Sequence, residues 1–320
     1  MSAKIGVLSN AHSKRNKDTL REFSALLQDH PQVKHLAFHD ISDLNECLRE
    51  MAEAGVTHLA VSGGDGTVQA TVSALINTNP FREPPKFSLL SGGMTNVIAR
   101  DLGETETPIP HLKRMIERVE TGDPGEPIDR PVMTLDLGDG GSPIHGFLLG
   151  AIAFYQGTLL GRRKVHAMGF SQDLAGRLGI LLSAMRFLWY GPGRKSGFTG
   201  ERVAMAFDGK AEAPQDLFLL VATTLTQILP GVKPFWGQGP GRLKITTIAH
   251  PPRRFGRAAL PTLRGKPRPW MAAEGYCSRR AERFECDLTS PVVFDGEFLE
   301  TDGGPGFKLS VGPTMTFTRY

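Results

Sequence analysis

Three glycines and one carboxylate follow an apolar run in the first third of the chain. The stretch reads Gly63, Gly64, Asp65, Gly66 and Thr67. Glycine permits a positive φ and removes the side chain where a ligand would press. A loop that opens a helix also offers free N–H groups to phosphate. Because Asp65 would repel phosphate without an intervening cation, we interpret the stretch as a cradle for a magnesium-bound nucleotide. The alternative is an ordinary strand-to-helix turn.

A second glycine-rich loop follows the next apolar run. After Ser91 it reads Gly92, Gly93, Met94, Thr95 and Asn96. Asn96 is a residue type that caps helices, which is the alternative to a role in ligand binding. A polar segment after the first apolar run adds Asn10 and Ser13 as candidates. Since ligands of parallel sheets bind at the carboxyl ends of the strands, these loops are expected to converge on one nucleotide.

Two more carboxylates flank a glycine near the carboxyl end, as Asp295, Gly296 and Glu297. Phosphoryl transfer to a hydroxyl needs positioned phosphates, charge neutralisation and a base for the proton. Glu297 is our candidate for that general base, and Asp295 would orient it or the metal. Asp65 would hold the catalytic Mg²⁺, directly or through water. The alternative for the triplet is a β-turn, because Asp-Gly is common in turns.

The first loop resembles one that is shared by diacylglycerol and sphingosine lipid kinases, NAD kinases and, more loosely, phosphofructokinases. The second loop narrows the choice, because it is similar to the G-T-x-N-x-x-A-R-x-L-G pattern of the diacylglycerol kinase family, which includes bacterial lipid kinases. The matching residues are Gly93, Asn96, Ala99, Arg100, Leu102 and Gly103. Asn10, Ser13 and residues 295–297 resemble further motifs of that family. The resemblance implies an enzyme that uses ATP and Mg²⁺ to phosphorylate a lipid hydroxyl.

The chain also departs from the family pattern. Met94 stands where the family usually has threonine, with Thr95 as the neighbouring hydroxyl. Lys14 replaces a glycine of the loop after the first strand. Residues 240–243 lack the aspartate that holds a structural magnesium in bacterial members, so that metal is expected to be absent. Residues 150–155 lack the aspartate of a G-x-G-x-D stretch.

Apolar periodicity predicts the elements that would position these residues. Strands are expected at 5–8, 33–38, 57–61 and 87–90, and helices at 18–29, 43–54 and 110–121. This alternation predicts a doubly wound parallel α/β sheet, the nucleotide-binding domain of residues 1–129. Beyond it, β-like runs separated by glycine and proline predict an all-β domain, an antiparallel β-sandwich for the lipid substrate over residues 130–313. Residues 314–320 are candidates to complete the first domain.

The composition is that of a soluble globular protein, with 40% hydrophobic and 22% charged residues. A net charge of +4 suits an acidic substrate or an anionic membrane surface and is too weak to indicate nucleic acid. The absence of a long apolar run and of a secretion signal predicts a cytoplasmic protein, peripheral at the inner membrane surface. Residues 174–190, apolar on more than one side and surrounded by basic residues, are expected to make transient membrane contact. The alternative is a helix packed across the second domain.

Three functions follow from these observations. The first is an ATP-dependent lipid kinase acting on a diacylglycerol-like or sphingoid-like hydroxyl. The second is a kinase of a soluble substrate such as NAD, against which the second loop and the β-rich carboxyl half argue. The third is a non-catalytic nucleotide- or lipid-binding relative, motivated by Met94 and the missing aspartates. The sequence identifies neither the lipid nor the oligomeric state, for which a homodimer is one option.

Overall fold

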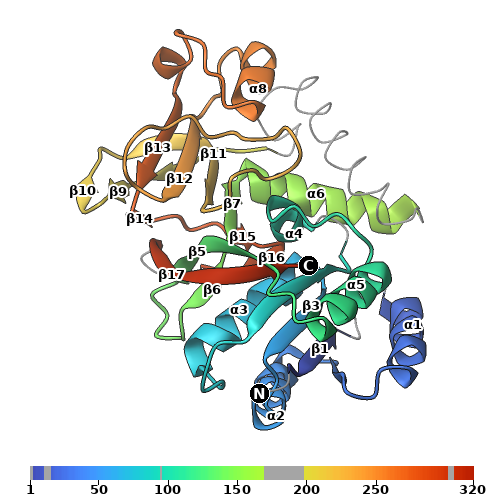
Figure 1. The fold of residues 1–320 in the computed structure, drawn as a ribbon. Coiled ribbons are helices and arrows are strands. Elements are labelled where there is room, and N and C mark those ends of the chain that lie inside the picture. Colours follow the sequence, from blue (N-terminus) through green and yellow to red (C-terminus); the bar gives the residue numbers. More distant parts are fainter. Residues whose placement is uncertain (1–2, 11–15, 94–95, 169–197, 302–305) are drawn as a thin grey trace. The chain divides into compact units, whose positions relative to one another are not determined.

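A computed structural model of the chain divides into two compact units. Unit 1 contains Met1–Val132 and Pro313–Tyr320, and unit 2 contains Met133–Gly312. In the part of the chain that the structure describes, no helix is long and apolar enough to cross a bilayer. Residues 174–190, where we expect a membrane-contacting helix, lie outside that part. The structure describes all residues except 1–2, 11–15, 94–95, 169–197 and 302–305 (Figure 1).

Unit 1 is built on a parallel sheet, in the strand order β4-β3-β1-β2 (Figure 1). β17 joins the sheet beside β4, in parallel, where Phe317 pairs with Phe87. β3 is buried along its whole length, as expected of a central strand with helices on both faces. The predicted parallel α/β fold is therefore confirmed. Its strands are β1 (Ile5–Asn10), β2 (Lys34–Phe38), β3 (His58–Gly63), β4 (Lys86–Ser91) and the last part of β17 (Phe307–Arg319).

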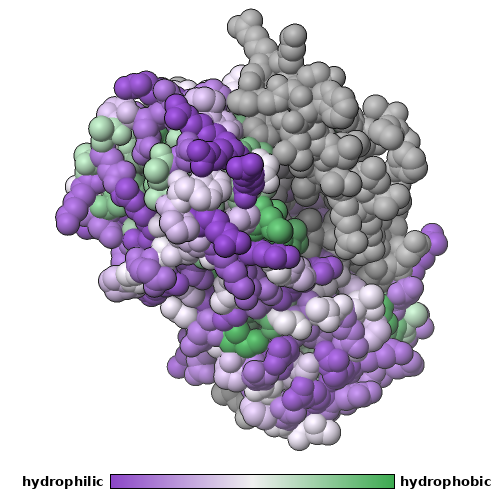
Figure 2. Space-filling model, turned by 90° about the horizontal axis from the view of Figure 1, so that it is seen from above, coloured by the Kyte–Doolittle hydropathy of each residue, from purple (hydrophilic) through white to green (hydrophobic). Residues whose placement is uncertain are grey.

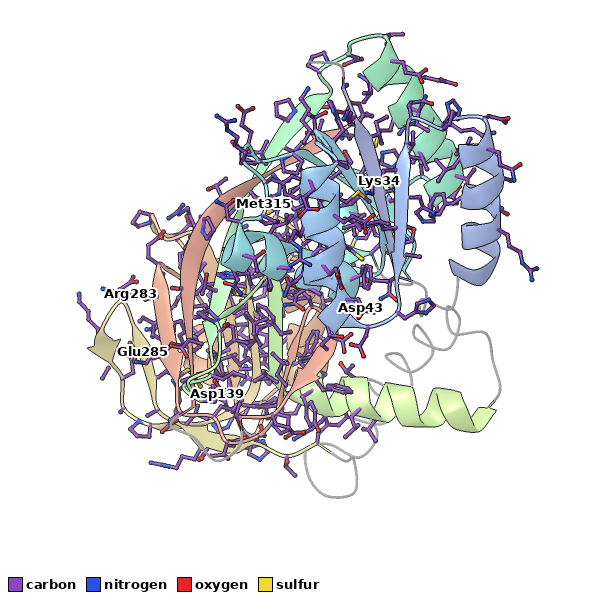
Figure 3. The ribbon with its side chains drawn as sticks, turned by 90° about the horizontal axis from the view of Figure 1, so that it is seen from below. Lys34, Asp43, Asp139, Arg283, Glu285 and Met315 are labelled. Atoms are coloured by element: carbon purple, nitrogen blue, oxygen red, sulfur yellow. The ribbon has the colours of Figure 1, made fainter. Side chains whose placement is uncertain are left out.

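Helix α5 of unit 1 buries one face. In α5, the side chains of Leu112, Met115, Ile116 and Val119 are buried, at the spacing of a single helical stripe. A salt bridge joins β2 to α2, since Lys34 of β2, labelled in Figure 3, pairs with Glu50 of α2 at 2.8 Å. The helices are α1 (Asn16–Gln28), α2 (Leu44–Glu53), α3 (Asp65–Thr78), α4 (Val97–Asp101) and α5 (Pro108–Glu120), with a 3-10 turn at Ile41–Asp43.

Unit 2 contains an antiparallel sheet in the order β13-β12-β11-β7-β15-β16, with β8 beside β11. β7 lies in its centre, paired with β11 on one side and β15 on the other. The β-rich second half that the sequence predicts is confirmed. The strands are β7 (Leu148–Ile152), β8 (Glu201–Val203), β11 (Gln215–Thr223), β12 (Leu243–Ala249), β13 (Tyr276–Ala281), β15 (Val292–Phe294) and β16 (Glu297–Leu299).

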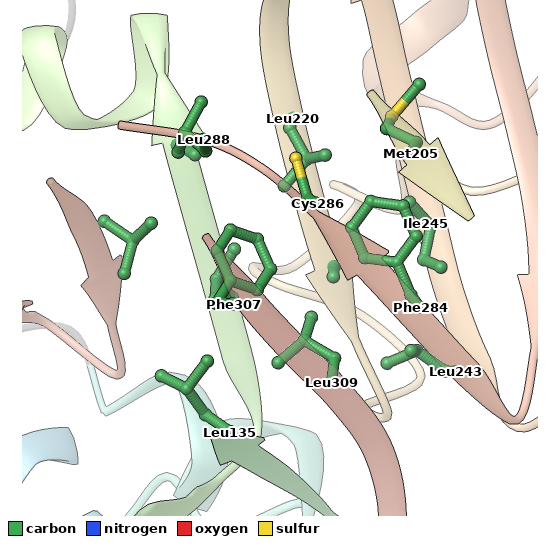
Figure 4. Packing of buried hydrophobic residues seen from close by; sticks show 14 of the residues in the cluster. Leu135, Met205, Leu220, Leu243, Ile245, Phe284, Cys286, Leu288, Phe307 and Leu309 are labelled. Atoms are coloured by element: carbon green, nitrogen blue, oxygen red, sulfur yellow. The ribbon is translucent and has the colours of Figure 1, made fainter. Parts of the chain in front are cut away.

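A second group of antiparallel strands supplies the other face of the core of unit 2. Figure 4 shows Phe284, Phe307 and Leu309 from this group packed in one cluster with Leu220 and Ile245 of the first sheet. All five side chains are at most 1–2% exposed, which is the burial of a sandwich interior. The strands are the last part of β5 (Glu126–Asp136), β6 (Ile144–Gly146), β9 (Met205–Phe207), β10 (Lys210–Ala211), β14 (Arg283–Cys286) and the first part of β17.

Unit 2 also has helices at positions where the sequence analysis expects none. α6 (Ala153–Met168) follows β7 directly, and α8 (Phe255–Leu263) lies between β12 and β13. A 3-10 turn, Ala272–Glu274, precedes β13. Ala153 and Ala258 belong to a small separate core together with Phe218, Met271 and Tyr276. These helices were missed because α6 contains two glycines and α8 is short and contains a proline, so their periodicity is weak.

Candidate functional site

The first predicted loop links β3 to α3, and close packing requires a glycine at its start. β3 ends at Gly63 and α3 begins at Asp65. Gly64 between them has φ −89° and ψ −177°, an extended conformation that any residue can adopt. A Cβ added to Gly63 would lie 2.5 Å from the side chain of Thr67. Neither Gly63 nor Gly64 has a positive φ. Gly63 has no room for a side chain, whereas a Cβ on Gly64 would lie 3.5 Å from the Cα of Gly93, which is an ordinary contact.

The second predicted loop approaches the first so closely that no side chain fits between them. Gly63 lies opposite Ser91 in the parallel β3–β4 pair, and the Gly92 N–H donates to the Gly63 carbonyl at 3.2 Å. A Cβ added to Gly93 would lie 2.4 Å from the Cα of Gly64. Two segments of bare backbone thus lie side by side at the carboxyl edge of the sheet. They adjoin the first turn of α3, whose free N–H groups attract phosphate.

Asn96 binds the backbone of the second loop, and Asp65 binds the backbone at the start of α4. Asn96 occupies the N-cap position of α4, at φ +47°, but its side chain does not cap the helix. Its amide instead accepts from the Gly93 N–H at 2.9 Å and donates to the Gly93 carbonyl at 3.0 Å. Asp65 supplies the cap, because its Oδ1 accepts from the Ile98 N–H at 3.1 Å. The capping role considered for Asn96 is therefore wrong, and Asp65 links the start of α3 to the first turn of α4.

The end of the first strand also reaches this site. The Asn10 side-chain amide donates to the Thr67 hydroxyl at 3.0 Å, which joins β1 to the first turn of α3. Gly66 lies in the same turn and is half-buried. The predicted site residues Ser13, Met94 and Thr95 lie outside the described residues. Within unit 1 the described loop residues therefore converge at one edge of the sheet.

Two serine hydroxyls also lie at this edge: Ser91 begins the predicted second loop, whereas Ser62 was not predicted. The Oγ atoms of Ser62 and Ser91 are buried and have no hydrogen-bond partner among the described residues. They stand at the ends of β3 and β4, next to the glycine loops. Buried polar groups are nearly always paired, so unpaired hydroxyls here fit a site that binds a polar ligand. In the sequence, the one indication of their role is that they adjoin the glycine loops, and any residue type could stand there.

The second-loop motif also contributes residues to the core of unit 1. Ala99 and Leu102 are each 4% exposed, so both belong to the core of unit 1. Gly103 ends α4 at φ +83°, a left-handed conformation in which L side chains are strained. Arg130 anchors the helix, since its Nε lies 2.7 Å from Oδ2 of the buried Asp101. The motif therefore fixes α4 behind the loop backbone.

The residues of this site fit a magnesium ion that is coordinated mainly by nucleotide phosphates better than one that is coordinated mainly by protein side chains. Asp65 is the single carboxylate of the two loops. Over the described ranges, no group of three or more His, Cys, Asp or Glu side chains could hold a metal. Mg²⁺ commonly takes most of its oxygens from phosphate and water.

In unit 2, Arg280 Nε donates to the Gly237 carbonyl at 3.2 Å, so a guanidinium binds the segment that leads to residues 240–243.

The Asp-Gly-Glu triplet forms the hairpin turn between β15 and β16. Phe294 pairs with Glu297, and the two residues between them have φ +47° at Asp295 and φ +93° at Gly296. Two positive φ values are typical of the tight turn that matches the twist of paired strands. Glu297 is exposed at the start of β16. The triplet is therefore a β-turn that also presents a carboxylate on a fixed backbone.

Asp295 is buried and fixes this turn to the centre of the sheet. Its Oδ2 accepts from the Phe147 N–H at 2.8 Å and its Oδ1 from the Leu148 N–H at 2.9 Å. The side chain lies so close to Gly146 that a Cβ there would be 2.2 Å from the carboxylate. Both carboxylate oxygens thus bind backbone amides of the β6–β7 segment. Asp295 positions the hairpin that carries Glu297, and Gly146 is an unpredicted part of that arrangement.

Unit 1 is thus an α/β unit whose parallel strands end in two touching glycine loops. Residues 4–124 match the family model described as "Diacylglycerol kinase catalytic domain". Residues 4–124 are thus similar to the catalytic domain of diacylglycerol kinases. A search of curated protein sequences finds no match.

Solved structures extend the likeness of fold to almost the whole chain. A diacylglycerol kinase from Bacillus anthracis strain Sterne superposes with a TM-score of 0.58 at 14% identity, over 99% of this chain and 97% of that one. Two more structures from the same organism give TM-scores of 0.63 and 0.62 at 16% and 17% identity. They cover 99% of this chain and 96% and 97% of theirs. At such identities the likeness shows the fold alone.

Proposed function

We propose that the protein is an ATP-dependent lipid kinase, which transfers the γ-phosphoryl group of ATP to a lipid hydroxyl. The observation that carries the proposal is the contact of bare backbone between Gly64 and Gly93 at the start of α3. A nucleotide's phosphates can approach such backbone closely and accept from its N–H groups. The family match over residues 4–124 supports phosphoryl transfer as the reaction.

The residues of unit 1 would bind and orient ATP. The loops around Gly63 and Gly92 would hold the phosphates, and the buried hydroxyl of Ser91 would donate to one of them. Asp65 would bind Mg²⁺ through water, since its Oδ1 already accepts from Ile98. Mg²⁺, when bound, neutralises charge that develops on the phosphates. Positioning and charge neutralisation account for most of the catalysis of phosphoryl transfer, so a rigid pair of loops suits this task.

Glu297 would serve as the general base that removes the proton of the lipid hydroxyl. Its carboxylate is exposed, and its backbone is fixed by the turn that Asp295 anchors. A base held on a rigid hairpin keeps its geometry while solvent and substrate reach it. Asp295 acts through Glu297 and is therefore a positioning residue. The protein would meet its lipid at the cytoplasmic membrane surface.

The test is a phosphorylation assay with labelled ATP, Mg²⁺ and a panel of diacylglycerol, a sphingoid base, a prenol and NAD. We expect a labelled lipid, and we expect Glu297→Gln to lower kcat by about 10²–10⁴-fold. Glu300→Gln is the matched control, because Glu300 is an exposed carboxylate that follows the same short strand. Full activity of Glu297→Gln would exclude the assigned base. If NAD is labelled and no lipid is, the acceptor is NAD and the proposed lipid acceptor is wrong.

One observation favours the alternative of a non-catalytic nucleotide-binding protein. The Asp65 Oδ1 atom is engaged by the Ile98 N–H, so the carboxylate has a structural use of its own. Nucleotide binding by calorimetry, with no transfer to any acceptor in the panel, would support this alternative.

A further inference from the structure

The outer face of α8 exposes two leucines. Leu260 is 54% exposed and Leu263 46%, and they are the large hydrophobic side chains that stand exposed in the described part of the chain. The opposite face is packed, since Ala258 is fully buried and Thr262 is 6% exposed. Single exposed leucines are common, but two neighbours on one turn of a helix form an apolar patch that a partner can cover.

The chain around this patch is strongly basic. Between Pro251 and Trp270 the sequence has no carboxylate, and its basic side chains are exposed. The acidic group that packs against them is Glu274, with Oε1 3.3 Å from Nε of Arg254 and Oε2 4.0 Å from Arg253. The exposed cations are Arg253, Arg254, Arg257, Arg264, Lys266 and Arg268. Five positive charges therefore remain in excess over one carboxylate, around an apolar patch.

This segment is held firmly in unit 2. The Tyr276 hydroxyl donates to the Arg253 carbonyl at 2.8 Å, just before α8. At the other end of the helix the Lys233 N–H donates to the Leu263 carbonyl at 2.8 Å. Met271, fully buried, joins the same small core as Ala258. The leucines and their basic surroundings are thus part of a fixed surface.

The loop bonded to the end of α8 also lines a basic cavity of about 160 Å³. Four cations line it: Lys233, Lys244, Arg279 and Arg280. Arg279 pairs with Glu212, whereas Arg280 and Lys244 donate to main-chain carbonyls, which leaves their charge in place. No carboxylate lines the cavity among the described residues. The space exceeds what one water needs, so a phosphate group suits both its size and its charge.

We propose that the α8 segment docks the protein on an anionic lipid bilayer, with Leu260 and Leu263 entering the interface and the adjoining cavity binding one lipid phosphate. An apolar helix face with a basic rim is the combination that binds anionic membranes. Nucleic acid would match the charge but not the leucines. The choice of a bilayer as the partner rests on the proposed lipid-kinase function. In Figure 2, which views the molecule from the side on which Figure 1 draws α8, the described surface is mostly hydrophilic with small hydrophobic areas.

The test measures co-sedimentation of the full chain with vesicles, in the absence of ATP. We expect binding to phosphatidylcholine vesicles that contain phosphatidylglycerol, at least about ten-fold weaker binding to phosphatidylcholine alone, and weakening by salt. Leu260→Ser with Leu263→Ser should weaken binding about ten-fold. Lys233→Gln, which changes an exposed cavity residue, should weaken it roughly five-fold. Circular dichroism checks that each variant is folded.

A matched control removes charge elsewhere, with Arg49→Gln and Arg82→Gln on exposed positions of unit 1, and should bind as the unchanged protein does. Binding that survives the double leucine change would overturn docking through α8. Binding that survives Lys233→Gln, or equal binding to both kinds of vesicle, would overturn the phosphate site. Because the assay needs no turnover, vesicle binding without kinase activity would reject only the proposed function. Phosphorylation of detergent-dispersed lipid without vesicle binding would reject only the docking.

Discussion

At the scale of single residues, the two catalytic candidates of the carboxyl half differ in environment. Asp295 is 3% exposed and both its oxygens accept backbone N–H groups, whereas Glu297 is exposed. A carboxylate with both oxygens engaged is suited to fixing a backbone, and an exposed one to taking a proton. The geometry thus separates the two carboxylates of one motif into a positioning residue and the proposed base.

This difference predicts that replacing Asp295 lowers the free energy of unfolding, because its main role is structural. Asp295→Ala leaves the buried N–H groups of Phe147 and Leu148 without acceptors and puts alanine at a positive φ. We expect a loss of about 3 kcal/mol in the free energy of unfolding, measured with urea. Asp136→Ala is the control, since that exposed carboxylate accepts a single N–H, from Gly138. Equal losses in the two variants would contradict the role given to Asp295.

At the scale of elements, a buried pair of titratable side chains joins the α4–α5 connection to α5. Glu104 Oε2 lies 3.5 Å from Nδ1 of His111, and the side chains are 6% and 0% exposed. Burial raises the pKa of Glu104 to about 7, against opposing effects of Arg114 and Arg319. Burial lowers the pKa of His111 to about 4, with Arg114 contributing. The second loop precedes α4, and Glu104 follows the other end of that helix.

The raised pKa of Glu104 predicts a pH-dependent stability. The unfolded chain releases this proton near pH 4.5, whereas the folded chain holds it until about pH 7. The contribution is therefore complete below pH 4.5 and is lost as the pH rises through 7. Glu104→Gln removes that loss, so its stability relative to the unchanged protein should rise by about 2 kcal/mol between pH 5 and pH 8. Urea unfolding at both pH values measures this.

The comparison with an exposed carboxylate isolates the effect of burial. Glu83→Gln, on an exposed turn of unit 1, should show no such change between the two pH values. A pH-independent difference for Glu104→Gln would mean that Glu104 is ionised in the folded chain at pH 5 as well.

At the scale of the whole molecule, the chain leaves unit 1 at Val132 and returns to it at Pro313. The returning segment is part of the core: Phe317 is 2% exposed and its ring lies 5.3 Å from that of Phe87. The Ser88 hydroxyl donates to the Thr318 carbonyl at 2.6 Å. Tyr320, 3% exposed, packs in the same cluster as α5. The candidate nucleotide site thus stands on a sheet that needs both ends of the sequence.

Truncating one buried side chain of the returning segment should show that the stability of unit 1 depends on this segment. Phe317→Ala creates a cavity beside β4 and should lower the free energy of unfolding by about 3–5 kcal/mol. Thr314→Ala, on an exposed position of the same strand, should change it by about 0.5 kcal/mol or less. Thermal unfolding followed by circular dichroism measures both. If the two variants melt together, unit 1 does not depend on its last strand.

The sequence by itself determined the order of elements in unit 1, the two glycine loops and the Asp-Gly-Glu turn. Periodicity, glycine and turn residues act over a few neighbours, so these features can be predicted without the fold. Even there the boundaries moved, since β3 continues to Gly63 beyond the predicted residue 61. Helices α6 and α8 could not be predicted, because their stability comes from packing on unit 2.

Only the tertiary structure decided what the site residues do. Gly93 must be glycine because Gly64 lies against it, and Asp65 caps a helix that begins at residue 97. Asp295 is fixed by amides of Phe147 and Leu148, far away in the sequence. Contacts of this kind join residues whose separation along the chain is bridged by strand pairing and core packing. No local pattern encodes them, so chemistry could be expected from residue types, but each residue's role followed from its neighbours in space.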